Sequence, residues 1–357
     1  MYRPLLRLFQ GPIHVYESDI HNHAAEHDMI ADEQFRQSAK AAVRDDPSRP
    51  VKRAFDAAVS DVRRQGRQRD RQHVREFRSL RSALSRAKRE SVPRIPRSID
   101  HVHIVSPWAD TWSDERFLLC NDRHWGIAAF ATDENLEILQ KCKEVYIDGT
   151  FRSTPPPYKQ FVTIHGKFDG RVLCLVSCLM GGKTTGHYRQ VFQCLKTAVR
   201  RLTRRRLKPR RIVCDFEQAI ILAAETEFPR VAISGCYFHF CQSLYRKIQT
   251  LGLTTQYGTD LRLQKSIRML MSIGYLPVAV VRHTFTQFCQ SQNFNVLSTT
   301  YPQLDDFVEY ISSTYFNGPF PPVMWNIYTR DSSNRTNNHV EGMALMNVVF
   351  SQFQFVR

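Results

Sequence analysis

The chain has 357 residues, and its 50 Lys and Arg against 34 Asp and Glu give a formal net charge of +16, which suits a polyanionic partner. Its nine cysteines are odd in number and lie mostly in apolar segments, which indicates reduced thiols rather than a disulfide framework. No apolar run reaches the roughly 18 residues of a membrane span, so we expect a cytosolic or nuclear protein without a membrane partner.

The N-terminal part is a basic region with helical periodicity. Apolar residues recur at helical spacing at Val51, Phe55, Val59 and Val62, and again at Val74, Phe77, Leu80 and Leu84, with a break near Gly66. The stretch from Arg63 to Glu90 holds eleven basic and three acidic residues. Such helices either contact phosphates, with Arg63, Arg64 and Arg67 as candidates, or present an ordinary solvated face. We expect residues 27–97 to form a basic helical region for DNA binding or dimerisation.

The centre of the chain predicts a mixed α/β sheet. Five β-rich runs, at residues 144–148, 159–168, 171–180, 211–215 and 231–237, alternate with helical patterns at 184–202, 219–228 and 239–251. The pair Asp169-Gly170 joins the second and third runs as a hairpin. Residues 254–315 follow with further helical patterns at 261–273 and 277–288.

Two of the predicted strands end on an aspartate, Asp148 and Asp215, each after a run of β-favouring apolar residues. Carboxylates at neighbouring strand ends can bracket a pair of Mg²⁺ or Mn²⁺ ions, which prefer oxygen ligands. The first and fourth strands must then be neighbours in the sheet. The alternative is that each aspartate only caps a turn.

A third acid, Glu341, follows an Asn-Asn-His sequence near the C-terminus. On a helix, Asn337 and Asn338 lie four and three residues before Glu341, so they share its face and are placed to orient the carboxylate or to contact DNA. His339 either contacts a phosphate or is structural.

A dense basic cluster occupies residues 200–211, where eight of twelve residues are Lys or Arg. It precedes the strand that ends at Asp215, and we expect it to lie next to the proposed site. Its candidate DNA-binding residues are Arg200, Arg201, Arg204, Arg205 and Arg206. It can equally serve as a nuclear-import signal or form a solvated turn.

Four segments, Asp148-Gly149-Thr150-Phe151, Asp215-Phe216-Glu217, the run 235–240 and the run 335–342, together resemble Mutator-like element (MULE) transposases over roughly residues 95–342. The resemblance implies an RNase H-like mixed five-stranded sheet flanked by helices, with a helical insertion before the third acid. It also implies a DDE triad of Asp148, Asp215 and Glu341. On this basis residues 98–253 are the first part of the catalytic core, residues 254–330 the insertion and residues 331–357 the segment with the glutamate.

The function that the resemblance implies is metal-dependent hydrolysis at transposon ends followed by strand transfer into target DNA. Its cofactor is a pair of Mg²⁺ or Mn²⁺ ions held by the three acids. Its partners are transposon-end and target DNA and further copies of the same chain, and its location is the nucleus.

Two possible zinc elements accompany the resemblance. Cys236 and His239 match the family's C-x-x-H element, with Cys241 nearby, but no second ligand pair with finger spacing follows, and we expect a structural role without zinc. His21 and His23 resemble the last ligands of a FLYWCH-type finger. Because residues 1–19 contain no cysteine, we expect residues 1–26 to be an incomplete remnant of that finger.

The tail departs from the family pattern, because residues 343–350 are apolar where similar proteins carry Trp and a polar helix. We therefore expect a truncated glutamate segment. Two interpretations remain, an active DDE transposase and a domesticated or truncated derivative that binds DNA or a regulatory partner without catalysis.

Overall fold

The computed structural model describes residues 27–47, 49–65, 76–92, 96–111, 113–150 and 154–330. The chain divides into two compact units, residues 1–93 and residues 94–357. Among the helices of the described ranges, none combines the length and apolarity that a membrane crossing requires. The finer division expected within residues 98–357 stays a prediction.

The first unit is helical, as its periodicity predicts. Its helices are α1 (His27–Asp45), α2 (Val51–Gln65) and α3 (Phe77–Ser91). Their apolar faces form one core, in which Phe35 of α1 meets Phe55 of α2 with ring centroids 5.7 Å apart, and Leu84 of α3 is fully buried. The predicted apolar residues of α2 and α3 therefore serve the unit's own core. Val74, Gly66 and Arg67 lie outside the described residues.

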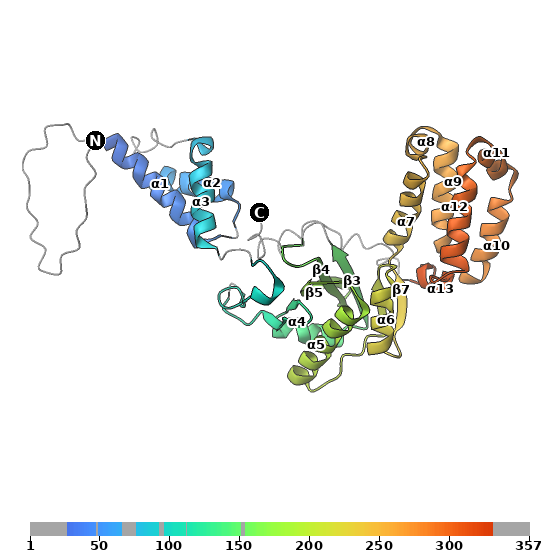
Figure 1. Cartoon of the computed structure of the whole chain (residues 1–357), viewed down its shortest axis with the longest axis horizontal. Coiled ribbons are helices and arrows are strands. Elements are labelled where there is room, and N and C mark those ends of the chain that lie inside the picture. The colour runs from blue at the N-terminus through green and yellow to red at the C-terminus, as the bar shows by residue number, and fades with distance from the viewer. Residues whose placement is uncertain are drawn as a thin grey trace, which may run out of the picture. The chain divides into compact units, whose positions relative to one another are not determined.

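The second unit contains a sheet and many helices (Figure 1). Its strands are β1 (Leu118–Asp122), β2 (Ile127–Phe130), β3 (Glu144–Thr150), β4 (Gln160–Phe168), β5 (Arg171–Met180), β6 (Arg211–Cys214) and β7 (Ala232–Gly235). Its helices around the sheet are η1 (Ile99–His101), α4 (Asp133–Lys141), α5 (Thr185–Thr203), α6 (Gln218–Glu227) and α7 (Tyr237–Thr250). The helices after these are α8 (Thr254–Thr259), α9 (Leu261–Ser272), η2 (Ile273–Tyr275), α10 (Val278–Cys289), α11 (Gln292–Thr300), α12 (Gln303–Ile311), η3 (Ser312–Phe316) and α13 (Pro322–Trp325).

Within the described part of the chain, the sheet has seven strands in the order β1-β2-β5-β4-β3-β6-β7. β3 and β6 are parallel, as are β6 and β7, and the other pairs are antiparallel. All five predicted strands are present, and the β4–β5 hairpin turns at Asp169 and Gly170, both with positive φ. The expected total of five strands is wrong, because the short buried run Ile127–Phe130 pairs with β5 and brings β1 with it.

One face of the sheet is covered by α4, α5 and α6. The apolar residues predicted for the 184–202 helix, Tyr188, Val191, Phe192, Leu195 and Val199, are all buried in α5. They share a core with Val145 and Ile147 of β3 and with Ile212 of β6. Because side chains alternate along a strand, the intervening residues of β3 and β6 point to the opposite face.

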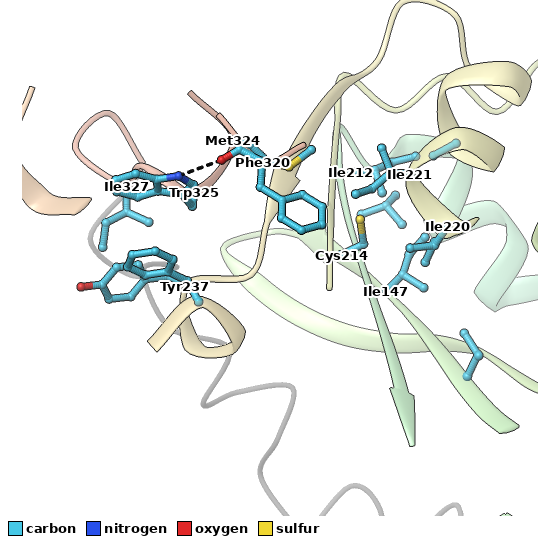
Figure 2. Packing of buried hydrophobic residues seen from close by; sticks show 14 of the residues in the cluster. Ile147, Ile212, Cys214, Ile220, Ile221, Tyr237, Phe320, Met324, Trp325 and Ile327 are labelled. Carbon is cyan, nitrogen blue, oxygen red and sulfur yellow. Dashed lines mark hydrogen bonds between the residues drawn. The ribbon is translucent and has the colours of Figure 1, made fainter. Parts of the chain in front are cut away.

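The described residues 254–325 are mainly helical, from α8 to α13. Trp325 of α13 is fully buried, stacks on Phe240 of α7 with ring centroids 4.7 Å apart, and donates its indole N–H to Phe320 O at 3.1 Å (Figure 2). The same apolar cluster continues to Ile212 and Cys214 in the sheet. Helix α7 therefore begins next to the sheet, and the rest of the helix packs against the helices that follow it, α8 to α13, which we call the helical layer.

Candidate active site

The sheet brings Asp148 and Asp215 together at one end of two parallel strands. β3 and β6 pair with Tyr146 opposite Val213, and β6 ends at Cys214. Continuing this register by two residues sets Asp148 beside Asp215, on the face that Tyr146 and Val213 share. The Asp148 side chain is 12% exposed and that of Asp215 is 52% exposed. One carboxylate is thus sheltered and its neighbour is open to solvent.

His239 lies against both carboxylates. Its Nε2 is 4.0 Å from Asp148 Oδ1, and its Nδ1 is 3.7 Å from Asp215 Oδ1. It occupies the first turn of α7, the helix that follows β7, and β7 is parallel to β6. The ends of three successive parallel strands therefore deliver the two acids and the imidazole to one place.

It is electrostatically unfavourable for the carboxylates of Asp148 and Asp215 to be charged side by side. Burial raises the pKa of Asp148, the nearby His239 opposes this rise, and the negative charge of Asp215 adds to it. The backbone N–H of Gly149 also stabilises the Asp148 carboxylate and lowers its pKa. A cation between the two carboxylates would relieve both the burial cost and the mutual repulsion.

A buried polar strip continues from Asp148 across β4 and β5. Thr163 lies opposite Asp148, and Ser177 lies opposite Thr163. His165 Nε2 is 2.9 Å from Thr163 Oγ1, and burial lowers the pKa of His165 to about 4. The imidazole of His165 is therefore neutral at physiological pH.

The segment after Asp215 is fixed by two further contacts that the sequence did not predict. Gln160 Nε2 donates to Tyr188 OH at 2.9 Å, and Tyr188 OH donates to Glu217 Oε2 at 3.3 Å. Phe216 packs edge-on against Phe320, with ring centroids 5.2 Å apart. The ring of Phe216 thus packs against the helical layer, and the carboxylate of Glu217 is bound by Tyr188 of α5.

Arg330 ties the end of the described chain to this region. Its guanidinium donates to Gly235 O at 2.9 Å and to Met324 O at 2.7 Å. Burial lowers its pKa to about 10, and Tyr146 and Cys236 are among the groups around it. The chain therefore returns from the helical layer to the sheet face that carries Asp148 and Asp215.

The other predicted site residues lie in different parts of the chain. The basic cluster does not lie next to the acids, because residues 200–211 precede β6 and Asp215 follows it, at the opposite strand end. Arg63 and Arg64 belong to the other unit, at the end of α2. The predicted residues Asn337, Asn338, His339 and Glu341, the remnant at 1–26 and the tail lie outside the described residues.

The C-x-x-H pair has two different surroundings. Cys236 is 2% exposed and packs with Tyr146 and Val213, whereas His239 faces the carboxylates. Within the described ranges, no group of three or more His, Cys, Asp or Glu side chains is arranged to hold a metal ion.

The fold and the site define a mixed α/β protein with two carboxylates at adjoining parallel strand ends. Residues 144–243 match the family model of the MULE transposase domain, which supports a relationship to Mutator-like transposases and suggests a transposase-type function. The match runs from the start of β3 into α7 and so includes Asp148, Asp215 and His239. No curated protein matches the chain.

Proposed function

We propose that this chain is a DDE-type transposase that hydrolyses phosphodiester bonds at transposon ends and joins them to target DNA. The observation that carries the proposal is the juxtaposition of Asp148 and Asp215 at the ends of β3 and β6, within the residues that match the MULE transposase domain. We assign Asp148, Asp215 and Glu341 as the catalytic acids.

The strand order supports an RNase H-like core. Within the seven strands, β5-β4-β3-β6-β7 form an antiparallel trio followed by two strands parallel to β3. The acids then occupy the central strand and its parallel neighbour. In this assignment β1 and β2 extend the core at the β5 edge.

The residues present suit hard divalent ions. Asp148 and Asp215 offer carboxylate oxygens, and the charge of Asp215 raises the pKa of Asp148, a repulsion that a bound cation would reduce. Asp148 and Asp215 would hold Mg²⁺ or Mn²⁺, and such ions would supply activation of the attacking water or hydroxyl and stabilisation of the leaving oxygen. The chain's own side chains hold the ions and orient the DNA strand. His239 lies against both carboxylates.

The third acid of the proposed triad, Glu341, lies outside the described residues. It follows Arg330 by 341 − 330 = 11 residues, and Arg330 is bound to Gly235 O on the same sheet face. An extended chain spans about 3.3–3.6 Å per residue, so the intervening segment is long enough to bring the third carboxylate to the pair. Asn337, Asn338 and His339 would then lie close to the DNA.

The remaining parts of the proposal follow from the reaction. A transposase acts on chromosomal DNA, so the chain works in the nucleus, and joining two transposon ends requires at least two copies of it. The C-x-x-H element acts without zinc, with Cys236 packed in the fold and His239 at the acids.

The proposal is tested by cleavage of transposon-end DNA with Mg²⁺ or Mn²⁺. The wild type is expected to release a nicked product only with the metal. Asp148→Asn, Asp215→Asn and Glu341→Gln are each expected to reduce the rate by at least about a hundredfold while DNA binding is retained. A wild type that binds DNA and gives no metal-dependent product would contradict catalysis and favour the non-catalytic derivative.

A further inference from the structure

The strand end opposite the acid pair is hollowed by two basic cavities. The first, of about 870 Å³, lies between the end of α5 and the loops before β6 and β7, and its cations are Lys196, Arg200, Arg206, Lys208 and Arg230. The second, of about 630 Å³, lies at the starts of β3, β6 and β7, and its cations are Lys141, Lys143, Lys167, Arg210, Arg211 and Arg330. They adjoin at consecutive residues, Pro209 with Arg210 and Val231 with Ala232.

The charge of this double cavity is strongly positive. Eleven cations and three acids line it, so its balance is 11 − 3 = +8, as large as half of the chain's +16. Two of the acids are already neutralised, because Glu227 binds Arg189 and Lys196, and Glu144 lies 3.4 Å from Arg211. Among the described residues, no ion pair engages Arg200, Arg206, Lys208, Arg210 or Arg230, and all five are exposed. These cations remain open to an external anion.

The loop before β6 presents its cations in a fixed direction. Helix α5 ends where Arg204 takes a left-handed conformation, with φ of 59°, and the chain turns toward the sheet. Leu207 and Pro209 are buried, whereas Arg206, Lys208 and Arg210 are exposed. This alternation anchors the loop through its apolar residues and directs three cations outward. They are therefore preorganised for a negatively charged backbone.

We propose that this double basic cavity is a second, non-catalytic DNA-binding surface that holds the phosphate backbone of duplex DNA. The aromatic side chains among its lining residues, Phe168 and Phe228, pack against the hydrophobic core and offer no platform for unpaired bases. β6 separates the surface from Asp215 by four residues, about 13 Å at the usual strand rise, so the phosphates bound here are not those that are cut. The proposal rests on the proposed function only in taking DNA as the partner.

The test measures binding of the full chain to a fluorescein-labelled 30-base-pair duplex of arbitrary sequence. Chelator is present, and affinity is followed from 50 to 300 mM salt. The variant Arg206→Glu/Lys208→Glu/Arg230→Glu is expected to bind at least about tenfold more weakly at 100 mM salt. The slope of log affinity against log salt concentration should fall by about 2.7, since each lost phosphate contact contributes about 0.9.

The matched control reverses three exposed cations on α7 and α9, in Arg246→Glu/Lys265→Glu/Arg268→Glu, and changes the net charge equally. It should keep wild-type affinity. The neutral variant Arg206→Gln/Lys208→Gln/Arg230→Gln, checked for an unchanged thermal midpoint, guards against misfolding and should lose affinity in the same direction. Equal losses in the surface and control variants, or none in either, would overturn the proposal.

Two further experiments distinguish DNA binding at this surface from other roles of the same cations. Asp148→Asn is expected to bind the arbitrary duplex as tightly as the wild type, so loss of cleavage and loss of this binding are independent results. A surface variant that binds the duplex normally but stays outside nuclei would assign the cations to nuclear import, and tighter wild-type binding to an RNA duplex would assign them to RNA. Either result would overturn the DNA proposal.

Discussion

His239 Nδ1 lies 3.7 Å from Asp215 Oδ1, which ties the first turn of α7 to the end of β6. The contact joins two elements that no short motif connects. It also places the imidazole against both acids, since His239 Nε2 lies 4.0 Å from Asp148 Oδ1. Because His239 lowers the pKa of Asp148, replacing it should change that pKa in one direction.

Replacing His239 by Gln is expected to move the acidic limb of metal-dependent cleavage to higher pH. His239 lowers the pKa of Asp148 against the larger effect of burial, so its loss lets that pKa rise and leaves the carboxylate protonated at pH values where the wild type is ionised. A pH–rate profile of both proteins gives the measurement. The exposed His283→Gln on α10 is the control and should leave the profile in place. A His239→Gln profile shifted to lower pH would contradict this role.

His165 is expected to make the protein less stable in mild acid. Burial lowers its pKa from 6.5 to about 4, so between these values the unfolded chain binds a proton that the folded chain does not. The stability contribution is complete above pH 6.5 and is lost as the pH falls toward 4. Between pH 7 and pH 5 the loss is about 2 kcal/mol.

The measurement is urea unfolding of the wild type and of His165→Gln at pH 7 and pH 5. The variant should lose about 2 kcal/mol less stability than the wild type over this interval. His103→Gln replaces an exposed histidine and should behave as the wild type. Equal pH dependence in His165→Gln and the wild type would show that His165 titrates normally in the folded chain.

Trp325→Ala is expected to cost about 3–5 kcal/mol of unfolding free energy. The indole is fully buried, stacks on Phe240 and donates to two carbonyls, Tyr315 O at 3.0 Å and Phe320 O at 3.1 Å. Val323→Ala in the same short helix removes a side chain from a residue that is 70% exposed, and should cost less than about 0.5 kcal/mol. Denaturant unfolding compares the two, and similar losses would contradict the packing argument.

Arg330→Ala is expected to weaken cleavage through the third acid. It removes both hydrogen bonds, to Gly235 O and Met324 O, and so frees the chain eleven residues before Glu341 (341 − 330 = 11). Catalysis should then require more divalent metal, and raising the Mn²⁺ concentration should restore part of the rate. Arg262→Ala, at a side chain that is 69% exposed, is the control. A rate deficit that is the same at every metal concentration would point to general destabilisation instead.

The strands with their terminal acids are predictable because their signals are local. Val, Ile and Tyr before Asp148 indicate a strand, and the Asp169-Gly170 pair indicates the hairpin turn that the structure contains. The apolar face of α5 follows from helical periodicity in the same way. Each of these features depends on residues a few positions apart.

Other features depend on distant parts of the chain. β2 has only four residues, and all four are buried. A run this short shows no alternation of apolar and polar residues that would predict a strand, and its pairing with β5 depends on burial. The position of His239 beside the two aspartates depends on β7 pairing with β6, and the order of strands in a sheet cannot be predicted from a single sequence. The basic cluster is close to Asp215 in sequence but lies at the other end of β6. Because a strand is extended, its two ends are far apart in space.

Helix α7 also determines how the domain can be divided. Its first turn carries His239, while Phe240, Leu244 and Ile248 are 0% exposed and share the core of the helical layer. Excising residues 254–330 would uncover this apolar stripe directly behind His239. The helical layer is therefore not a detachable module, and any shortened form of this unit has to retain it to stay folded.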